Sequence, residues 1–583
     1  MSEKFKFTMI AFDGLIARQN PDLRKVQGWV SWEPGSQDYP KDGPKNNRIE
    51  IINYDEISGK ELDDLVFVPA SKSGKTYSVY DVDSTNMHQR HRESLFGTIL
   101  RTIDLFEEKD ALGRRISWQF GDFPLKVFPY GATNRGAEYS RYDQWLKFSY
   151  KRSKKNPDDV IYTCASPDII AHETAHAVLD AIAPELHGSV LSLEPHTAAL
   201  HEAIADLTTV FLTLTMKEVR EKVLNFTKGD LRQPCNIGWV AEEYGDAFSR
   251  AGINQYLRNL WSDNSLNLNW GNLVDEINDT YNLSLVFSGA IYRAMIDEYF
   301  QIWEDLCTPQ IGDPFSLTGK ALFVASQKIR RMLFRALDYL PPSNMVTFLD
   351  LARAILVADE AAYPRAIDSR VRKNMTKIFL DRGIAKSEGD LKSTPITNRM
   401  LFSNIDLNRF RENRAELDQF VDAHRSDLGL PLKQYLNSQI QLRSKYIYLP
   451  NNKSHYVQEY VIKISWSKRV KLSGIRRIQQ VSGISIAVDA GSNQIKHMFS
   501  TIRNAGEGGF LKNRERVMDR YLNGLIARYN LNDVSGLTKN ERNELGSPHY
   551  TIDATGQIHI HGLHVGLHDK AKGSISGSRG ASF

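Results

Sequence analysis

The sequence predicts an α+β protein with more than one domain, and three observations lead to this prediction. The chain has 583 residues, about three to four times the length of a common domain. Short strand-like segments fill the first 80 residues, whereas apolar residues recur at helical spacing over most of residues 166–381. Hydrophobic residues make up 41% and charged residues 25%, which suits folded domains and excludes a wholly disordered or fibrous chain.

The N-terminal third alternates between strand-like and helical patterns. The segments FKFTMIAF, RIEIINY and DLVFVPA are typical of strands, and turns rich in Gly, Pro and Asn separate them. Leu95, Ile99, Ile103 and Phe106 recur at spacings of three and four, which predicts a helix over residues 90–108. Strands are expected again in RRISWQF, PLKVFPYG and GAEYSRYDQWLKFSY.

These patterns divide the chain into four regions. We expect a β-rich region over residues 1–80 and a mixed core over 81–385. Residues 386–440 read as a polar linker followed by a charged helix. Residues 441–583 form a basic C-terminal domain of strand-like and helical pieces, which ends in a flexible Gly/Ser-rich tail, KAKGSISGSRGASF.

Positive charge is concentrated in the C-terminal part. Residues 441–529 contain 16 Lys or Arg against 5 Asp or Glu, a local net charge of +11, whereas the whole chain carries +4. Within this segment, the run KISWSKRVKLSGIRR, residues 463–477, has six basic and no acidic residues. It can bind nucleic acid or an anionic membrane through phosphate contacts, or it can pack on the acidic remainder of the same chain. No nucleic-acid-binding motif accompanies it, so contact within the chain or with a protein partner is the favoured interpretation.

The sequence also indicates a cellular compartment. No apolar run approaches the length of a membrane span, and the N-terminus has no apolar segment typical of a secretion signal. The three cysteines, Cys164, Cys235 and Cys307, are too few and too scattered for a disulfide framework. We therefore expect a cytoplasmic protein.

One helical segment carries a metal-binding pattern, SPDIIAHETAHAVLDAIAP. Ser166 is suited to cap a helix, and Pro167 to occupy its first position. His172 and His176 are four residues apart, so both imidazoles project from one helix face and can share a zinc ion. Glu173 lies between them and is placed to reach a water on the metal rather than the metal itself.

A catalytic zinc site requires a third protein ligand. The next helical segment, HTAALHEAIADLTTVFLTL, carries Glu202 and Asp206 on a face otherwise lined by Ala and Leu. Carboxylates on such a face are costly unless they are paired or bind a metal. We therefore predict Glu202 as the third zinc ligand and Asp206 as the residue that orients a ligand imidazole.

DIIAHETAHAV followed by HEAIAD resembles the thermolysin-like gluzincins, in particular a group that lacks secretion signals. The resemblance extends upstream through HRESLFGTILRTIDLFEEKDALGRRISW and covers roughly residues 81–383. It implies a two-lobed fold, with a β-rich N-terminal lobe, a helical C-terminal lobe and zinc in the cleft between them. Residues 81–385 are accordingly expected to be a thermolysin-like zinc peptidase core.

The resemblance also implies an activity. A water bound to the zinc, activated by Glu173 as general base, would hydrolyse the peptide bonds of a protein or peptide substrate. We expect a regulated intracellular endopeptidase. Two alternatives stay open: an aminopeptidase-like exopeptidase, and a zinc-binding scaffold with weak catalysis and an anion- or protein-binding C-terminal domain.

Two further site predictions rest on the resemblance. The family places an oxyanion-stabilising His near DTYNLSLVFSGAIYRAM, which contains none, and Tyr281 is predicted to supply the missing donor. His187 and His196 are alternative donors, whereas His201 is expected to face away from the site. The family's substrate-binding edge strand corresponds to GAEYS, so Ala137, Glu138 and Tyr139 are the predicted substrate-binding residues.

Overall fold

The computed structural model describes most of the chain except for several loops and most of the C-terminal region. The described residues are 3–10, 26–32, 38–73, 77–133, 136–141, 143–187, 195–232, 235–241, 244–245, 247, 256–266, 280–307, 314–363, 369–448, 454–472, 475–501, 549–552 and 558–561. The predicted flexible tail lies outside them.

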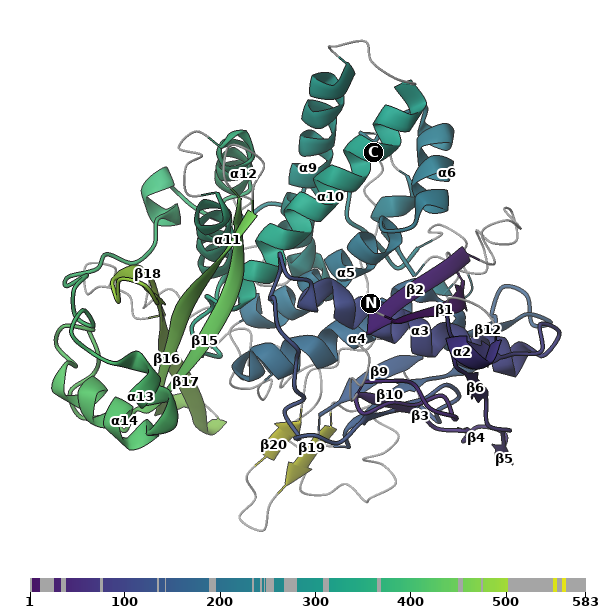
Figure 1. Cartoon of the computed structure of the whole chain (residues 1–583), viewed down its shortest axis with the longest axis horizontal. Coiled ribbons are helices and arrows are strands. Elements are labelled where there is room, and N and C mark those ends of the chain that lie inside the picture. Colours follow the sequence, from purple (N-terminus) through teal and green to yellow (C-terminus); the bar gives the residue numbers. More distant parts are fainter. Residues whose placement is uncertain are drawn as a thin grey trace.

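The chain mixes helices and small sheets, which is compatible with the predicted α+β class (Figure 1). The strands of the N-terminal half form several short sheets. They are β1 (Glu3–Met9), β2 (Val26–Trp32), β3 (Ile49–Ile51), β4 (Tyr54–Asp55), β5 (Lys60–Glu61), β6 (Val66–Val68), β7 (Val79–Asp81), β8 (Leu125–Phe128), β9 (Ala137–Ser140), β10 (Trp145–Phe148), β11 (Tyr150–Arg152) and β12 (Val160–Tyr162).

The sheet that matters for the site has four strands in the order β3-β8-β10-β9. Strands β3, β8 and β10 run parallel, and β9 pairs antiparallel with β10. Strand β9 therefore lies at the edge of this sheet and packs beside the helix that carries the HExxH residues. All four residues of β9 are buried.

Helices form the centre of the molecule. They are α2 (Ala70–Ser73), α3 (Met87–Glu107), α4 (Pro167–Ile182), α5 (Pro195–Thr213), α6 (Lys217–Thr227), α9 (Thr280–Cys307), α10 (Pro314–Leu337), α11 (Phe348–Ala362) and α12 (Arg370–Asp381), and a short ladder of β13 (Trp239–Val240) and β14 (Arg258–Asn259) lies between α6 and α9 in sequence. None of the helices in the described part of the chain is both long and apolar enough to cross a bilayer.

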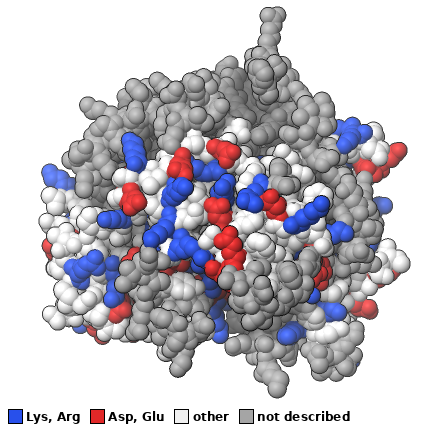
Figure 2. All heavy atoms as spheres, turned by 90° about the horizontal axis from the view of Figure 1, so that it is seen from above, with Lys and Arg blue, Asp and Glu red and all other residues white. Residues whose placement is uncertain are grey.

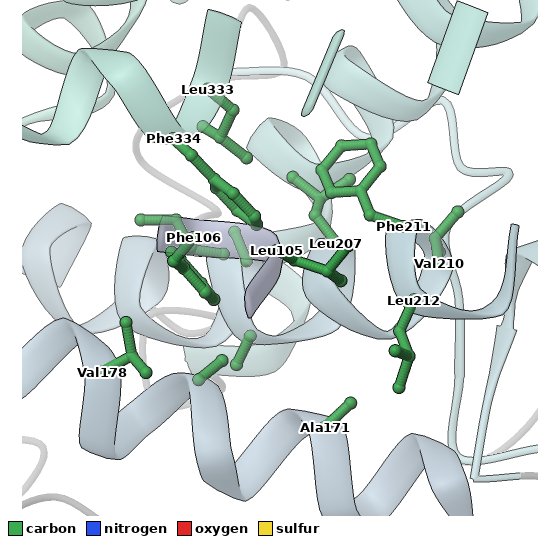
Figure 3. Close-up of a cluster of buried hydrophobic side chains, with 14 of the residues drawn as sticks. Leu105, Phe106, Ala171, Val178, Leu207, Val210, Phe211, Leu212, Leu333 and Phe334 are labelled. Atoms are coloured by element: carbon green, nitrogen blue, oxygen red, sulfur yellow. The ribbon is translucent and has the colours of Figure 1, made fainter. Parts of the chain in front are cut away.

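The main hydrophobic core joins elements from distant parts of the sequence. Figure 3 shows side chains of α3, α4, α5 and α10 meeting in one cluster. The rings of Phe106 and Phe334 stack with their centroids 3.8 Å apart, and Phe211 meets Phe334 edge to face at 5.8 Å. This core holds α4 and α5 together, and both helices carry the predicted metal ligands.

The segment RRISWQF, predicted as a strand, is not one. Residues 114–120 are described as bends, turns and irregular backbone. Its polar groups are bonded by other means, since the Ile116 N–H donates to the Glu107 carboxylate and the Trp118 indole donates to the Arg48 carbonyl at 2.8 Å. The prediction was wrong because the N–H groups of this segment donate to a side chain and a carbonyl that are not on a neighbouring strand. The alternation of residue types in the sequence does not reveal such partners.

The C-terminal region contains an antiparallel sheet with its own apolar cluster. Its strands follow the order β15-β16-β17-β18, namely β15 (Asn437–Tyr448), β16 (Ser454–Leu472), β17 (Ile475–Asp489) and β18 (Ile495–Ser500). The predicted charged helix is two short helices, α13 (Leu407–Glu412) and α14 (Arg414–Ala423), which Asn413 separates while capping the second. A two-stranded ladder, β19 (His549–Ile552) with β20 (Ile558–His561), follows.

The sheet docks onto the helical core through buried charges. Asp338, at the end of α10, lies 2.7 Å from Arg114 and 3.3 Å from Lys445 of β15. Lys445 is also 3.0 Å from Glu459, whose carboxylate accepts a hydrogen bond from Tyr339 at 3.0 Å. Lys445, which belongs to the basic residues 441–529, therefore lies beside an acidic group of the helical core.

Part of the segment predicted as a polar linker packs on the helical core. Ile384, Ala385 and Leu391 are buried members of the main core, and Arg353 of α11 donates to the Asp390 carbonyl. The polar side chains of residues 383–399 thus lie mostly on the side of the segment that faces solvent. Figure 2 shows Lys and Arg side chains interspersed with Asp and Glu over the middle of one face.

Candidate metal centre

The first two predicted ligands lie on α4, whose boundaries agree with the sequence prediction. The Ser166 side chain accepts a hydrogen bond from the Ile169 N–H at 3.3 Å, and Pro167 begins the helix. His172 and His176 are one turn apart, and their Nε2 atoms lie 3.0 Å from each other. Both side chains are almost fully buried.

Glu202 on α5 completes the group. Its carboxylate oxygens lie 3.3 Å from His172 Nε2 and 3.7 Å from His176 Nε2. Alanines lie at the buried positions beside the ligands in both helices, which lets the helices approach closely. In the described part of the chain, His172, His176 and Glu202 are the group of side chains that could hold a metal ion.

Asp206 and Arg258 lie on the Nδ1 side of the His172 ring, opposite the Nε2 atom that faces the other ligands. Asp206 Oδ1 lies 2.9 Å from His172 Nδ1, as predicted for the residue that fixes this imidazole. The Arg258 guanidinium donates to both carboxylate oxygens of Asp206, at 2.7 and 2.6 Å. Sequence reasoning missed Arg258, which reaches the site from β14 and has no motif in its vicinity.

The electrostatics of this group favour a cation. Burial alone raises the pKa of Asp206, but Arg258 and His172 hold it below its usual value. Burial lowers the pKa of His172, yet hydrogen bonds to Asp206 and Glu202 outweigh this effect and raise it to about 9. The two carboxylates therefore stabilise positive charge at the imidazoles, where a divalent cation would lie.

Glu173 lies in the same buried region but outside the ligand group. Its Oε2 atom makes no hydrogen bond to any described residue. Burial, followed by the negative charges of Glu202 and Glu138, raises its pKa to about 7, while His172 and Arg258 act in the opposite direction. Glu173 is therefore a buried carboxylate next to the ligand His172 in sequence, with a raised proton affinity.

His201 was expected to face away and instead contacts a ligand. Its Nδ1 lies 2.6 Å from Nδ1 of His176, and the two ring planes differ by 8°. Burial, with the nearby positive charges of Arg141 and His172, lowers the pKa of His201 to about 3. A neutral His201 can therefore accept a hydrogen bond from the ring N–H of His176. The expectation was wrong because α4 packs against the α5 face that carries both His201 and Glu202.

The predicted oxyanion donors are only partly gathered at the site. Tyr281 lies in the first turn of α9, is buried, and faces Arg258, whose guanidinium carbon is 4.8 Å from the ring centroid. His196 stacks on Phe348 with centroids 4.2 Å apart and accepts from the Phe348 N–H at 3.4 Å. The side chain of His187 lies outside the described residues.

The predicted substrate-binding residues form edge strand β9. Glu138 accepts a hydrogen bond from the Thr133 hydroxyl at 2.7 Å, and its charge acts on Glu173. The Tyr139 hydroxyl donates to Asp180 of α4 at 2.6 Å. Ala137 is fully buried. The strand is thus fastened to the HExxH helix through Tyr139.

Comparison with protein-family models yields no match, and comparison with curated proteins yields none either.

Proposed function

We propose that the chain is a zinc-dependent peptidase of the thermolysin-like gluzincin type, with two lobes around the metal site. The observation that carries this proposal is the buried group of His172, His176 and Glu202 with the Glu173 carboxylate beside it. A scaffold that merely held a metal would have no need of a buried carboxylate at this position. The motif spacing and the packing of α4 on α5 support the same interpretation.

The donor set fits zinc. Ligand atoms about 2.0–2.2 Å from a tetrahedral zinc ion lie roughly 3.3–3.6 Å from one another. The two Nε2 atoms lie 3.0 Å apart, and the carboxylate of Glu202 approaches His172 with Oε2 at 3.3 Å and His176 with Oε1 at 3.7 Å, which is close to that range. Two imidazoles and one carboxylate, with a fourth position open, are a common ligand set of catalytic zinc. When bound, zinc supplies Lewis acidity, which lowers the pKa of water and polarises a carbonyl.

Each of the other residues has its own role in the proposed reaction. Glu173 takes a proton from the attacking water and returns it to the leaving amine. Asp206 and Arg258 keep Nδ1 of His172 engaged, so that Nε2 faces the metal position. Tyr281 is the proposed donor to the oxyanion. The edge of β9 is the proposed position for an extended substrate, which would add to the sheet as a further strand.

An aminopeptidase is the second candidate function, and Glu138 favours it. A carboxylate on the edge strand, close enough to influence Glu173, could bind the free amino group of a substrate. An endopeptidase has no use for that interaction. Peptides with free and acetylated N-termini distinguish the two, since an aminopeptidase would lose nearly all turnover when the amine is blocked.

The test combines metal content with turnover. Mass spectrometry should find about one zinc per wild-type chain, and an unfolded protein substrate should be cleaved. Glu173→Gln should keep the zinc and lose hydrolysis, whereas His172→Ala and Glu202→Ala should lose both. A matched control is Glu298→Gln, which alters a buried carboxylate far along α9 and should leave cleavage intact. Equal cleavage by Glu173→Gln and wild type would falsify the proposal.

A further inference from the structure

The hairpin of β1 and β2 has one occupied edge and one open edge. On the outer side of β1, the Lys6 N–H donates to the Ser78 carbonyl at 3.0 Å, and the Ser78 N–H donates to the Lys4 carbonyl at 2.9 Å. The backbone groups of Lys4 and Lys6 therefore point away from β2. In an antiparallel pair, the alternate residues opposite them must point outward on the other strand.

The register identifies those outward residues on β2. Lys4 lies opposite Ser31, Lys6 opposite Trp29, and Thr8 opposite Gln27. The N–H and C=O groups of Gln27, Trp29 and Ser31 thus face away from β1. No hydrogen bond from these groups to another strand is found in the described part of the chain, and β2 ends its two-stranded sheet.

A cavity of about 550 Å³ runs along this open edge. Its lining includes Gln27, Trp29 and Ser31 of β2 and residues 215–218, where α6 begins. Lys4 of β1 and Tyr77 also contribute to it. The volume lies within the range of ordinary ligand sites. Trp29 is 41% exposed, and its ring also meets Tyr77 edge to face with the centroids 5.4 Å apart. Such an aromatic side chain leaves apolar surface that a partner can cover.

The charges that line the cavity are mostly positive. Lys4, Arg101 and Lys217 contribute cations, against one acidic lining residue, Glu218. Outside the lining, Asp104 lies 3.8 Å from Arg101 and Glu221 lies 3.3 Å from Lys217. We propose that the open edge of β2 binds an extended, acidic polypeptide segment of a partner protein, which adds to the hairpin as a third strand. The outward backbone groups supply hydrogen bonds, and the cations select acidic side chains.

The same charges disfavour two other occupants. Pairing of β2 with β2 of a second copy would bring two sets of these cations together. The chain's own C-terminal tail, residues 570–583, carries three Lys or Arg and no acidic residue, so it would also be repelled. An acidic partner segment is the occupant that can pair with the outward N–H and C=O groups of β2 and also complement the positive charge of the cavity lining.

The test uses two synthetic peptides and the full-length chain. Each peptide has seven residues, the length of β2, and alternates valine with either glutamate or lysine. Binding is measured by calorimetry in the Glu173→Gln background, which keeps the peptides intact whatever the activity of the metal site. Hydrogen exchange should show that the glutamate peptide protects the amides of Gln27, Trp29 and Ser31, which exchange rapidly in the free chain.

Two pairs of variants test the mechanism. Ser31→Pro removes one outward N–H that β1 does not use, which edge strands tolerate. It should weaken binding by at least about tenfold, roughly 1.4 kcal/mol, whereas Ser31→Ala should not. Lys217→Glu should weaken binding and reduce its salt dependence, whereas Lys217→Arg should preserve both. Equal melting temperatures of the Ser31 variants would show that the fold is intact.

Several results would overturn the proposal. They are failure of the glutamate peptide to bind at millimolar concentration, equal binding of the lysine peptide, or binding unaffected by Ser31→Pro. Protection of the Gln27, Trp29 and Ser31 amides in the free chain that disappears on dilution would indicate self-pairing and would also overturn it.

Discussion

Nδ1 of His201 lies 2.6 Å from Nδ1 of His176, so one of these imidazoles donates a hydrogen bond to the other. If His176 binds the metal through Nε2, its Nδ1 carries the hydrogen and His201 must accept it. The two ligand histidines are then oriented differently, His172 by a carboxylate and His176 by a neutral imidazole.

His201→Ala should weaken zinc affinity by about 10–100-fold, the usual effect of losing a residue that orients a ligand. The reason is that His176 would lose the acceptor that fixes its tautomer and ring orientation. Competition with a zinc chelator measures the affinity. His196→Ala is the control, because His196 is a buried histidine of the same helix that contacts Phe348 instead of a ligand. Similar zinc affinities for both variants would contradict this role of His201.

Arg258→Met should destabilise the fold by about 3–5 kcal/mol, because it leaves the buried carboxylate of Asp206 without its bidentate partner. Urea unfolding measures the loss. Arg258→Lys should retain part of the stability, since a lysine keeps the charge but not the two parallel hydrogen bonds.

The exposed pair of Arg293 and Asp297 provides the comparison for Arg258. Arg293 is bonded to Asp297 at 3.0 Å on the surface of α9, and Arg293→Met should cost less than about 1 kcal/mol. A comparable cost for both arginines would show that Asp206 does not depend on Arg258.

Tyr281→Phe should lower kcat by about 10²–10³ while zinc content and melting temperature stay unchanged. The substitution removes only the hydroxyl, so the ring can still face Arg258. Little change in KM is expected, because the hydrogen bond to an oxyanion forms in the transition state. Steady-state kinetics on one peptide measures the effect. A fall in kcat below about threefold would exclude Tyr281 as the oxyanion donor.

The contribution of Asp338 to stability should vanish in acid. Burial alone raises its pKa, but Arg114, Lys445 and Arg443 together hold it well below the usual value. Because the folded-state pKa is depressed, the stabilisation is complete above the unfolded-state pKa of about 3.9 and is lost as the pH falls further.

Unfolding of wild type and Asp338→Asn in urea checks this behaviour. At pH 7 the variant should be less stable by about 3–5 kcal/mol, because the cations of β15 lose their partner. The difference should shrink as the pH is lowered from 4 to 3. A difference that stays constant between pH 7 and pH 3 would contradict the predicted ionisation of Asp338.

Local sequence determined the parts of the site that lie within one helix. The cap at Ser166, the proline at position 167 and the four-residue spacing of His172 and His176 act over one or two turns, so the pattern was sufficient to predict them. Glu202 could be predicted because a carboxylate on an apolar helix face needs a partner. The α+β class followed in the same way from the change of hydrophobic period along the chain.

Tertiary structure alone decided which distant residues complete the site. Arg258 is 86 positions from His172 and meets it only because β14 packs against the helices, and His201 contacts His176 only because of the rotation of α5 against α4. Likewise, RRISWQF has a strand-like pattern but finds its partners in Glu107 and Arg48, and Asp338 finds its cations on β15. Periodicity reports which face of an element is apolar, whereas these pairings depend on how the packed faces are rotated and on where buried charges find opposite charges. Both are set by the folded chain as a whole.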